Sequence, residues 1–303
     1  MFNEERKMRF IEEREEEVVL PASYLSTQFN KIEKMENEFD KDLCNFTAYE
    51  IIEYYKMLNI TSIESLAVMN SQFSLYTNWC LKQNLVKDNQ NHFLEINYDI
   101  LGECINKALF NMRMVSRETI LGWIDMLVNP RDQFIILALY EGIRGKENCE
   151  LVQLKPEDVK GNIVTLCTGR QIKISDQLAK IIKQCIATDE YYGGGGRSFP
   201  LIENGYVIKD YNNVKDDVNS YQQGKRIYNS ISRTIKAVDK KYIVTANSIV
   251  ESGKLDMIKN RSEELGMTPK EYITSDYIKE VEQQYGCTIV HTVYLKKYKD
   301  YLV

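Results

Sequence analysis

The sequence predicts a mainly α-helical protein with one small antiparallel β-sheet, divided into two domains. Apolar residues recur at helical spacing along most of the 303-residue chain, and no strand pattern appears before residue 160. Two β-prone runs, residues 162–166 and 171–174, are joined by Cys-Thr-Gly-Arg, which indicates a hairpin. The length suffices for two domains. We therefore expect an all-helical domain over residues 1–112 and a helical domain with the small sheet over residues 113–303.

The first domain carries clear helix boundaries. Residues 1–18 are charged and helix-favouring, and Pro21 ends that run because proline is costly in a helix interior. Thr47 followed by Glu50 forms the capping-box pattern that opens a helix. Further helices are expected over Tyr24–Phe39, from Thr47 to Leu58, from Ser62 to Gln83 and over Ile100–Phe110.

The second domain combines the hairpin with several helices. Ser116 begins a capped helix, and Asn129-Pro130 separates it from another that runs through Tyr140. Four consecutive glycines, residues 193–196, indicate a flexible turn, and residues 199–210 are either a short strand pair or irregular. Further helices are expected over Ser175–Ala187, residues 222–239, Asn247–Leu265 and Lys270–Tyr285, with a closing segment from Ile289 to Tyr301.

The composition excludes several classes of protein. Hydrophobic residues make up 44% and charged residues 27%, as in soluble globular proteins, and no run approaches about 18 apolar residues, so we expect no membrane span. No secretory signal is expected. Seven cysteines without a CxxC pair indicate reduced, mostly buried thiols in a cytosolic protein. No metal or other cofactor is expected, because the chain lacks a Walker pattern and a Cys/His cluster with ligand spacing.

Charge is distributed unevenly along the chain. The net charge is −5, but the first 50 residues alone hold 13 acids against 7 bases. Residues 225–261 hold nine bases and three acids, enough to neutralise several phosphates of a nucleic acid. The alternative is a solvated helix face with mixed lysines. The acidic residues 1–20 do not suit a DNA-facing role and are expected on solvent or at a contact with another subunit.

One segment carries the most specific motif. A helix ends at Tyr140, Arg144 follows in a turn, Glu147 comes three residues later, and Leu151-x-x-Leu154 leads to Asp158 and the hairpin. This layout resembles the first active-site segment of the tyrosine recombinases, or phage integrases. The resemblance implies a helical core-binding domain and a catalytic fold that together form a C-shaped clamp around duplex DNA.

The family's chemistry needs a tyrosine nucleophile, cations around the scissile phosphate and a general acid. The resemblance implies that Arg144 contacts a phosphate and that Glu147 braces it. Cys167 stands near the position of the hairpin lysine, for which Arg170 or Lys173 substitutes only in part. In the segment that opens at Thr245, the resemblance places Asn247 and Val250 at the histidine and arginine of the family's His-x-x-Arg motif. Further along, it places Met267 at the position of a His or Trp, and Tyr277 is the vestigial nucleophile candidate.

We therefore predict a DNA-binding scaffold without catalytic residues. Lys41-Asp42-Leu43 before Phe46-Thr47, together with Asn129-Pro130-Arg131-Asp132-Gln133, resembles the lysogeny repressors of SPβ-like Bacillus phages. That resemblance implies a prophage transcriptional repressor in the host bacterial cytoplasm, associated with the nucleoid. Its partners would be operator sites in double-stranded DNA and, in addition, a second copy or a regulatory protein or peptide. The expected DNA contacts are Arg144, Arg170, Lys173, Arg197, Arg226, Arg233, Lys236, Lys254 and Arg261.

Two other readings remain open from the sequence. The first is an active site-specific recombinase that completes its site in an unusual way. The second is a protein-interaction module that uses the acidic N-terminus and the aromatic stripe Phe73, Tyr76 and Trp79, although this spacing is more typical of core packing.

Overall fold

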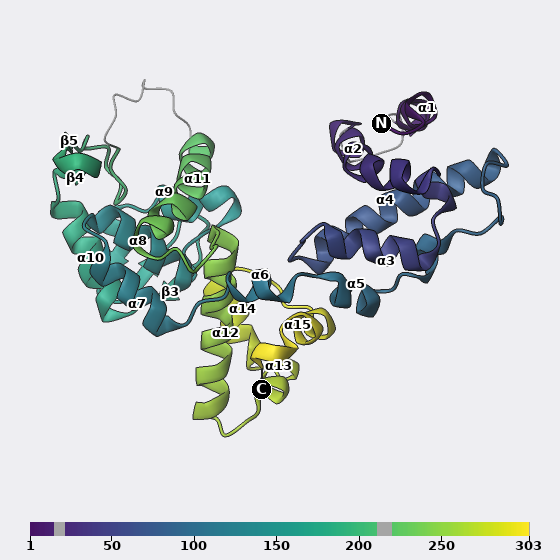
Figure 1. Cartoon of the computed structure of the whole chain (residues 1–303). Helices are drawn as coiled ribbons and strands as arrows, with labels where there is room; N and C mark the ends of the chain where they lie inside the picture. The colour runs from purple at the N-terminus through teal and green to yellow at the C-terminus, as the bar shows by residue number, and fades with distance from the viewer. Residues whose placement is uncertain (15–21, 211–219, 303) are drawn as a thin grey trace. The chain divides into compact units, whose positions relative to one another are not determined.

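The chain divides into two compact units, residues 1–110 and 111–303, each of which is described by itself. The computed structural model describes residues 1–14, 22–210 and 220–302 (Figure 1). The division between Phe110 and Asn111 lies two residues before the boundary expected from the sequence. Residues 15–18 of the expected first helix, and Pro21, lie outside the described residues. No described helix is long and apolar enough to cross a membrane.

The first unit is helical throughout its described residues. The Thr47–Glu50 capping box is present, and the Ser62 hydroxyl accepts from the Ser65 backbone N–H, as expected for helix starts. The expected helix over residues 100–110 is instead two short helices, because the Asn106 side chain caps the Leu109 N–H. The elements are α1 (Glu4–Arg14), α2 (Ala22–Phe39), η1 (Leu43–Asn45), α3 (Ala48–Met57), α4 (Ile63–Lys82), η2 (His92–Glu95), α5 (Tyr98–Cys104) and α6 (Lys107–Asn111).

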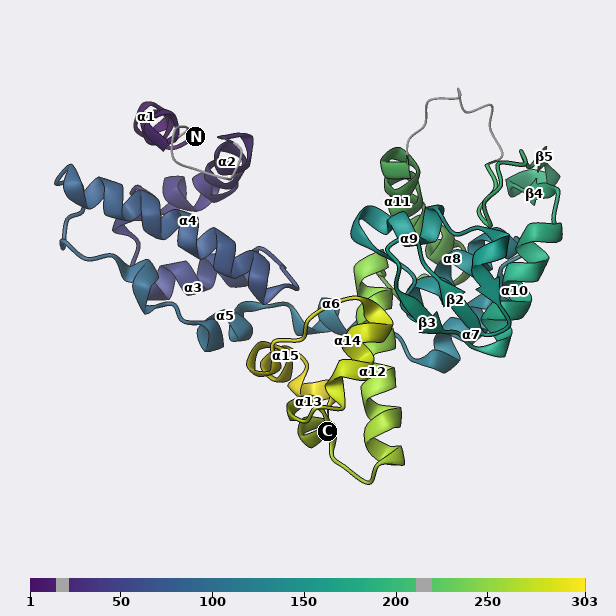
Figure 2. The ribbon, with the colours of Figure 1, turned by 180° about the vertical axis from the view of Figure 1, so that it is seen from behind.

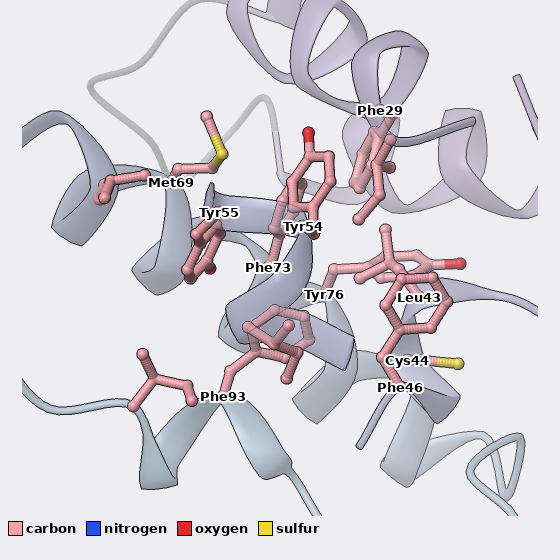
Figure 3. Close-up of a cluster of buried hydrophobic side chains, with 14 of the residues drawn as sticks. Phe29, Leu43, Cys44, Phe46, Tyr54, Tyr55, Met69, Phe73, Tyr76 and Phe93 are labelled. Carbon is pink, nitrogen blue, oxygen red and sulfur yellow. The ribbon is translucent and has the colours of Figure 1, made fainter. Parts of the chain in front are cut away.

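Aromatic side chains from these helices build the core of the first unit (Figure 3). Phe73 and Tyr76 are fully buried, and Phe29 lies within 6.0 Å of both rings. Trp79 is partly buried and donates from its indole N–H to Glu13 at 2.6 Å. The stripe Phe73, Tyr76 and Trp79 therefore packs inside the unit, and the idea that it contacts a protein partner is wrong.

The acidic N-terminal segment is also part of this unit. Phe10 and Ile11 of α1 are buried in the core. Lys7 is completely buried and donates to both oxygens of Glu36, which is equally buried and also accepts from the Leu43 N–H at 2.9 Å. Helix α1 is thus anchored by a buried ion pair that the sequence did not predict. The acids of α1 itself, Glu4, Glu5, Glu12 and Glu13, are exposed to solvent, which is one of the two placements expected for them.

The second unit is arranged around α8, whose residues from Phe134 to Tyr140 are all buried. Helices α7, α10 and α12 pack against it. Its further elements are α7 (Arg117–Met126), α8 (Pro130–Tyr140), η3 (Lys146–Asn148), α9 (Cys149–Val152), η4 (Pro156–Asp158), β1 (Val159–Lys160), β2 (Ile163–Thr165), β3 (Gln171–Lys173), α10 (Asp176–Ala187), β4 (Glu190–Tyr192), η5 (Gly194–Gly196), β5 (Ser198–Pro200), α11 (Ser220–Val238), α12 (Ala246–Glu264), α13 (Pro269–Thr274), α14 (Ile278–Tyr285), α15 (His291–Lys297) and η6 (Lys299–Tyr301).

The expected hairpin is present and lies at the face of this unit seen in Figure 2. Strands β1, β2 and β3 form an antiparallel sheet in that order, with Val164 opposite Ile172 and both side chains buried. Strand β1 was not expected from the sequence. The glycine run 193–196 joins a second antiparallel pair, β4 and β5.

The expected helix Lys270–Tyr285 is interrupted. Ser275 has extended backbone angles, and its hydroxyl donates to the Tyr272 carbonyl oxygen and accepts from the Tyr277 N–H. A serine that satisfies both helix ends in this way favours a break over continued helix. Helices α13 and α14 result, and Tyr277 stands immediately before α14.

Candidate nucleic-acid interface

The turn that carries Arg144 depends on two glycines in the left-handed region. Gly142 has φ +98° and Gly145 has φ +67°. A Cβ at Gly142 would lie 2.4 Å from the Gln284 carbonyl oxygen, so glycine alone allows this close approach of α14. Arg144 is half-buried, and its Nε–H has no hydrogen-bond partner among the described residues. A buried donor without a partner is costly, which is consistent with a ligand oxygen completing it.

Glu150, and not Glu147, is the glutamate that braces this turn. Glu150 is 2% exposed and accepts from the Arg144 backbone N–H, from the Thr168 hydroxyl at 2.6 Å and from Arg170. Glu147 is exposed and has φ +55°. The spacing of three residues from Arg144 was therefore misleading, because the left-handed residues Glu147 and Asn148 add a kink before α9.

Arg170 has a structural role in place of the expected DNA contact. Its guanidinium makes five hydrogen bonds, two to the Glu150 carboxylate and one each to the carbonyl oxygens of Gly142, Gln283 and Gln284. These bonds use all five N–H donors of an arginine. Arg170 thus ties the hairpin turn to the end of α8 and the end of α14, and has no donor left for a phosphate.

The three residues that the sequence comparison with the family's motif singled out, Asn247, Val250 and Met267, are uncharged and lie along α12 and just beyond it. Val250 is 3% exposed within α12, whereas Asn247 is exposed at its first turn. Met267 follows Gly266 at the other end of the helix. Tyr277 lies at the start of α14, whereas the Arg170 cluster contacts Gln283 and Gln284 at its end. These points are six to seven residues apart along the helix, which corresponds to a rise of about 10 Å.

Helix α11 presents an exposed cationic face. Ile227, Ile231 and Ile235 are buried at helical spacing, and Arg226, Arg233 and Lys236 on the other face are exposed. These three cations form no ion pair within the described residues. We call Arg226, Arg233 and Lys236 the α11 cationic face.

Close packing holds α11 against the arginine turn. The Asn148 side chain donates to the Gly224 carbonyl oxygen at 3.0 Å. A Cβ at Gly224 would lie 2.0 Å from the Glu147 carbonyl oxygen, so the two backbones touch because residue 224 is glycine. Helix α11 accordingly lies beside α9 in both views (Figures 1 and 2). The arginine turn and the beginning of α11, around Gly224, are therefore neighbours in the fold.

The other expected DNA contacts differ in whether the side chain is exposed and whether an acid of the protein pairs with it. Lys173 on β3 and Arg197 beside β5 are exposed. Lys254 is buried and pairs with Glu251 at 2.8 Å, so it presents no free ammonium ion to DNA. Arg261 pairs with Glu264 and Glu280, which neutralise its charge. Sequence reasoning could have flagged Lys254 and Arg261, because acids lie three residues from each on the same helix.

Comparisons with known proteins agree with this architecture. Residues 1–82 match the family model of the MrpR N-terminal core-binding domain, and residues 114–302 match that of the MrpR C-terminal catalytic domain. The SPbeta prophage-derived uncharacterized protein YopR of Bacillus subtilis (strain 168) is 26% identical over 271 residues, which cover 84% of this chain and 81% of YopR.

A solved structure shares the fold. The crystal structure of a lambda integrase (75–356) dimer bound to a COC′ core site matches with a TM-score of 0.51 and 12% identity, over 97% of this chain and 94% of the integrase. The mainly helical fold with small antiparallel sheets is thus that of the tyrosine recombinases, as the sequence predicted. With both domain models matched, the chain belongs to the MrpR family.

Proposed function

We propose that this protein binds double-stranded DNA at discrete operator sites and represses transcription, on a recombinase fold that does not cleave DNA. The observation that carries the proposal is the α11 cationic face. Its three exposed cations have no acidic partner within the described residues, and the helix that carries them packs through Gly224 against the turn of the half-buried Arg144. Cations that protein carboxylates do not neutralise are available for phosphates.

The lack of strand-cleaving chemistry is inferred from residue types. Valine cannot hold a phosphate, and Val250 is buried in α12. Neither Asn247 nor Met267 can supply a proton to a leaving oxygen at neutral pH. Arg170, the one cation in the hairpin turn, is fully bonded within the protein and stays protonated, so it is a poor general acid.

Similarity to other proteins supports DNA as the partner. The lambda integrase structure that shares this fold contains a DNA core site. YopR is derived from the SPbeta prophage, which favours a role in lysogeny for this family. We propose that Arg144, Lys173, Arg197 and the α11 cationic face contact the duplex, without Arg170, Lys254 and Arg261.

The test is a gel shift of the purified full chain with fragments of its source genome at two salt concentrations, with a denaturing gel for covalent adducts. We expect tight, salt-sensitive binding to a discrete repeated site and no adduct. A covalent adduct would establish an active recombinase instead. Absence of binding would favour an interaction module. A variant with Arg226→Ala, Arg233→Ala and Lys236→Ala should retain its thermal stability and lose most of its affinity.

A further inference from the structure

Two cysteines lie close together where the hairpin turn meets the start of α9. Cys149 is the first residue of α9, and Cys167 lies in the turn between β2 and β3. The residues that follow them are hydrogen-bonded to each other, because the Thr168 hydroxyl donates to the Glu150 carboxylate at 2.6 Å. The Cys149 thiol is near enough to act on the ionisation of Cys167, both by charge and as a hydrogen-bond partner. The fold thus brings together two thiols that are distant in sequence.

The Cys149 sulfur also packs against the turn that carries Arg144. A Cβ at Gly145 would lie 2.5 Å from the Cys149 Sγ, so the sulfur fills the space that a side chain at residue 145 would need. Gly145 follows Arg144 directly and has φ +67°, which favours glycine at this position. A covalent bond between Cys149 and Cys167 would therefore join the hairpin turn to the residue that packs on the arginine turn.

Solvent reaches this pair of thiols, in contrast to Cys44 and Cys80 in the first unit. Cys167 is exposed and Cys149 is partly exposed. Cys44 and Cys80 also lie close to each other, but they are 2% and 0% exposed within the aromatic core. Thiol–disulfide exchange requires access of the reagent to the sulfur. A reagent in solution can therefore oxidise the Cys149–Cys167 pair while the core shields the other pair.

The surroundings of Cys167 make its oxidation slow. Partial burial, the Cys149 thiol and the Glu150 carboxylate raise the pKa of the Cys167 thiol to about 11. Only the thiolate attacks a disulfide, so a small fraction of Cys167 is reactive at neutral pH. Disulfides that form within cytosolic proteins are mostly transient, and a slowly reacting pair of this kind is oxidised only by sustained exposure to an oxidant.

We propose that Cys149 and Cys167 form a reversible disulfide by exchange with a low-molecular-weight disulfide such as glutathione disulfide. The Cys167 thiolate attacks one sulfur of glutathione disulfide and releases one glutathione. The Cys149 thiolate then attacks the Cys167 sulfur of this mixed disulfide and releases the second glutathione. The two cysteines lose two protons and two electrons in total, which the two glutathione molecules carry away. This disulfide does not depend on DNA binding, so it is tested on the protein alone.

The test equilibrates the reduced full chain with glutathione disulfide, without DNA, and maps the remaining thiols by alkylation and mass spectrometry. Two of the seven thiols should be lost, with Cys149 and Cys167 recovered as one pair of linked peptides, and dithiothreitol should restore both. The yield should not change with protein concentration, because the bond lies within one chain. Dimers linked through Cys167, or glutathione that stays bound to Cys167 in the wild type, would overturn the proposal.

Three serine variants, each checked for folding by thermal unfolding in its reduced form, keep the test decisive. Cys149→Ser should accumulate a mixed disulfide between Cys167 and glutathione, which the wild type resolves. Cys167→Ser, at an exposed site, should form no internal disulfide. Cys287→Ser is the matched control, because Cys287 is another partly exposed cysteine of the second unit, and it should form the disulfide as the wild type does. A linked peptide that contains Cys287, or equal loss of thiols in all three variants, would show that accessible thiols react without regard to this pairing and would overturn the proposal.

Discussion

Arg170 and Arg233 are the same residue type in the same unit, and the structure uses them in opposite ways. Arg170 makes five hydrogen bonds, shares a salt bridge of 2.6 Å with the buried Glu150 and is 15% exposed at its side chain. Arg233 is exposed on α11 without an ion-pair partner in the described part of the chain. The comparison teaches that the availability of donors, rather than residue type, separates an arginine that holds the fold together from one that can bind a phosphate.

The largest expected effect is that of Arg170→Ala on stability. It leaves the Glu150 carboxylate buried without its cation, so the free energy of unfolding should fall by about 3–5 kcal/mol. Thermal and denaturant unfolding measure this loss. Arg170→Lys should not restore stability, because three donors cannot replace five. Arg197→Ala, at an exposed site, is the control and should change stability by less than about 0.5 kcal/mol. Equal stability of the Arg170 and Arg197 variants would contradict the structural role.

The buried ion pair between Lys7 and Glu36 in the first unit should make the stability of the protein depend on pH. Burial raises the pKa of Glu36 to about 7, despite Lys7 and the Leu43 N–H. Between the ordinary value of 4.5 and about 7 the folded state binds more protons at Glu36 than the unfolded state does. Its contribution to stability is therefore present below pH 4.5 and is lost as pH rises through 7, by at most roughly 3 kcal/mol.

This dependence is measured as a difference between two proteins. The free energy of unfolding of the wild type and of Glu36→Gln is measured from pH 4.5 to 7.5. The difference between the two proteins removes the pH dependence that all other titrating groups contribute equally to both. The wild type should lose more stability than the variant as pH rises across this window. Parallel curves would show that Lys7 keeps Glu36 ionised in the fold.

Gly224→Ala tests whether α11 must touch the arginine turn. A Cβ at this position meets the Glu147 carbonyl oxygen at 2.0 Å, so the helix must shift, at a cost of roughly 1–3 kcal/mol. Both stability and operator affinity should fall. Gly122→Ala in α7 is the matched control, since nothing lies within 4 Å of its Cβ and it should stabilise by about 0.5–1 kcal/mol. Unchanged operator affinity in Gly224→Ala would separate the α11 cationic face from the arginine turn.

The smallest expected effect is that of single exposed cations on DNA binding. Arg233→Ala should weaken binding evenly across sequences and lower the slope of log affinity against log salt by about 1, without loss of stability. Arg261→Ala changes the net charge equally but removes an arginine already paired with Glu264 and Glu280. Gel shifts over a salt series compare the two. If both variants lower the slope alike, net charge and not the α11 cationic face governs binding.

Local sequence patterns predicted much of the fold, because they depend on neighbours along the chain. The capping box at Thr47 and the caps at Ser62 and Ser116 are present as expected, and the helix expected from Ser175 begins there. The hairpin and the amphipathic spacing of α11 are present too. The breaks at Asn106 and Ser275 were not predicted, because each depends on which hydrogen bonds a polar side chain makes.

The candidate site was predicted less well, for a physical reason. The sequence by itself determined the family resemblance, the position of Arg144 in a turn after a helix and the excess of basic residues in 225–261. Only the tertiary structure decided that Glu150 and not Glu147 braces the turn, that Arg170 is fully bonded and that Lys254 is buried. Whether a charged side chain is free or paired depends on groups distant in sequence, such as Gln284 for Arg170, and these are brought together only by folding.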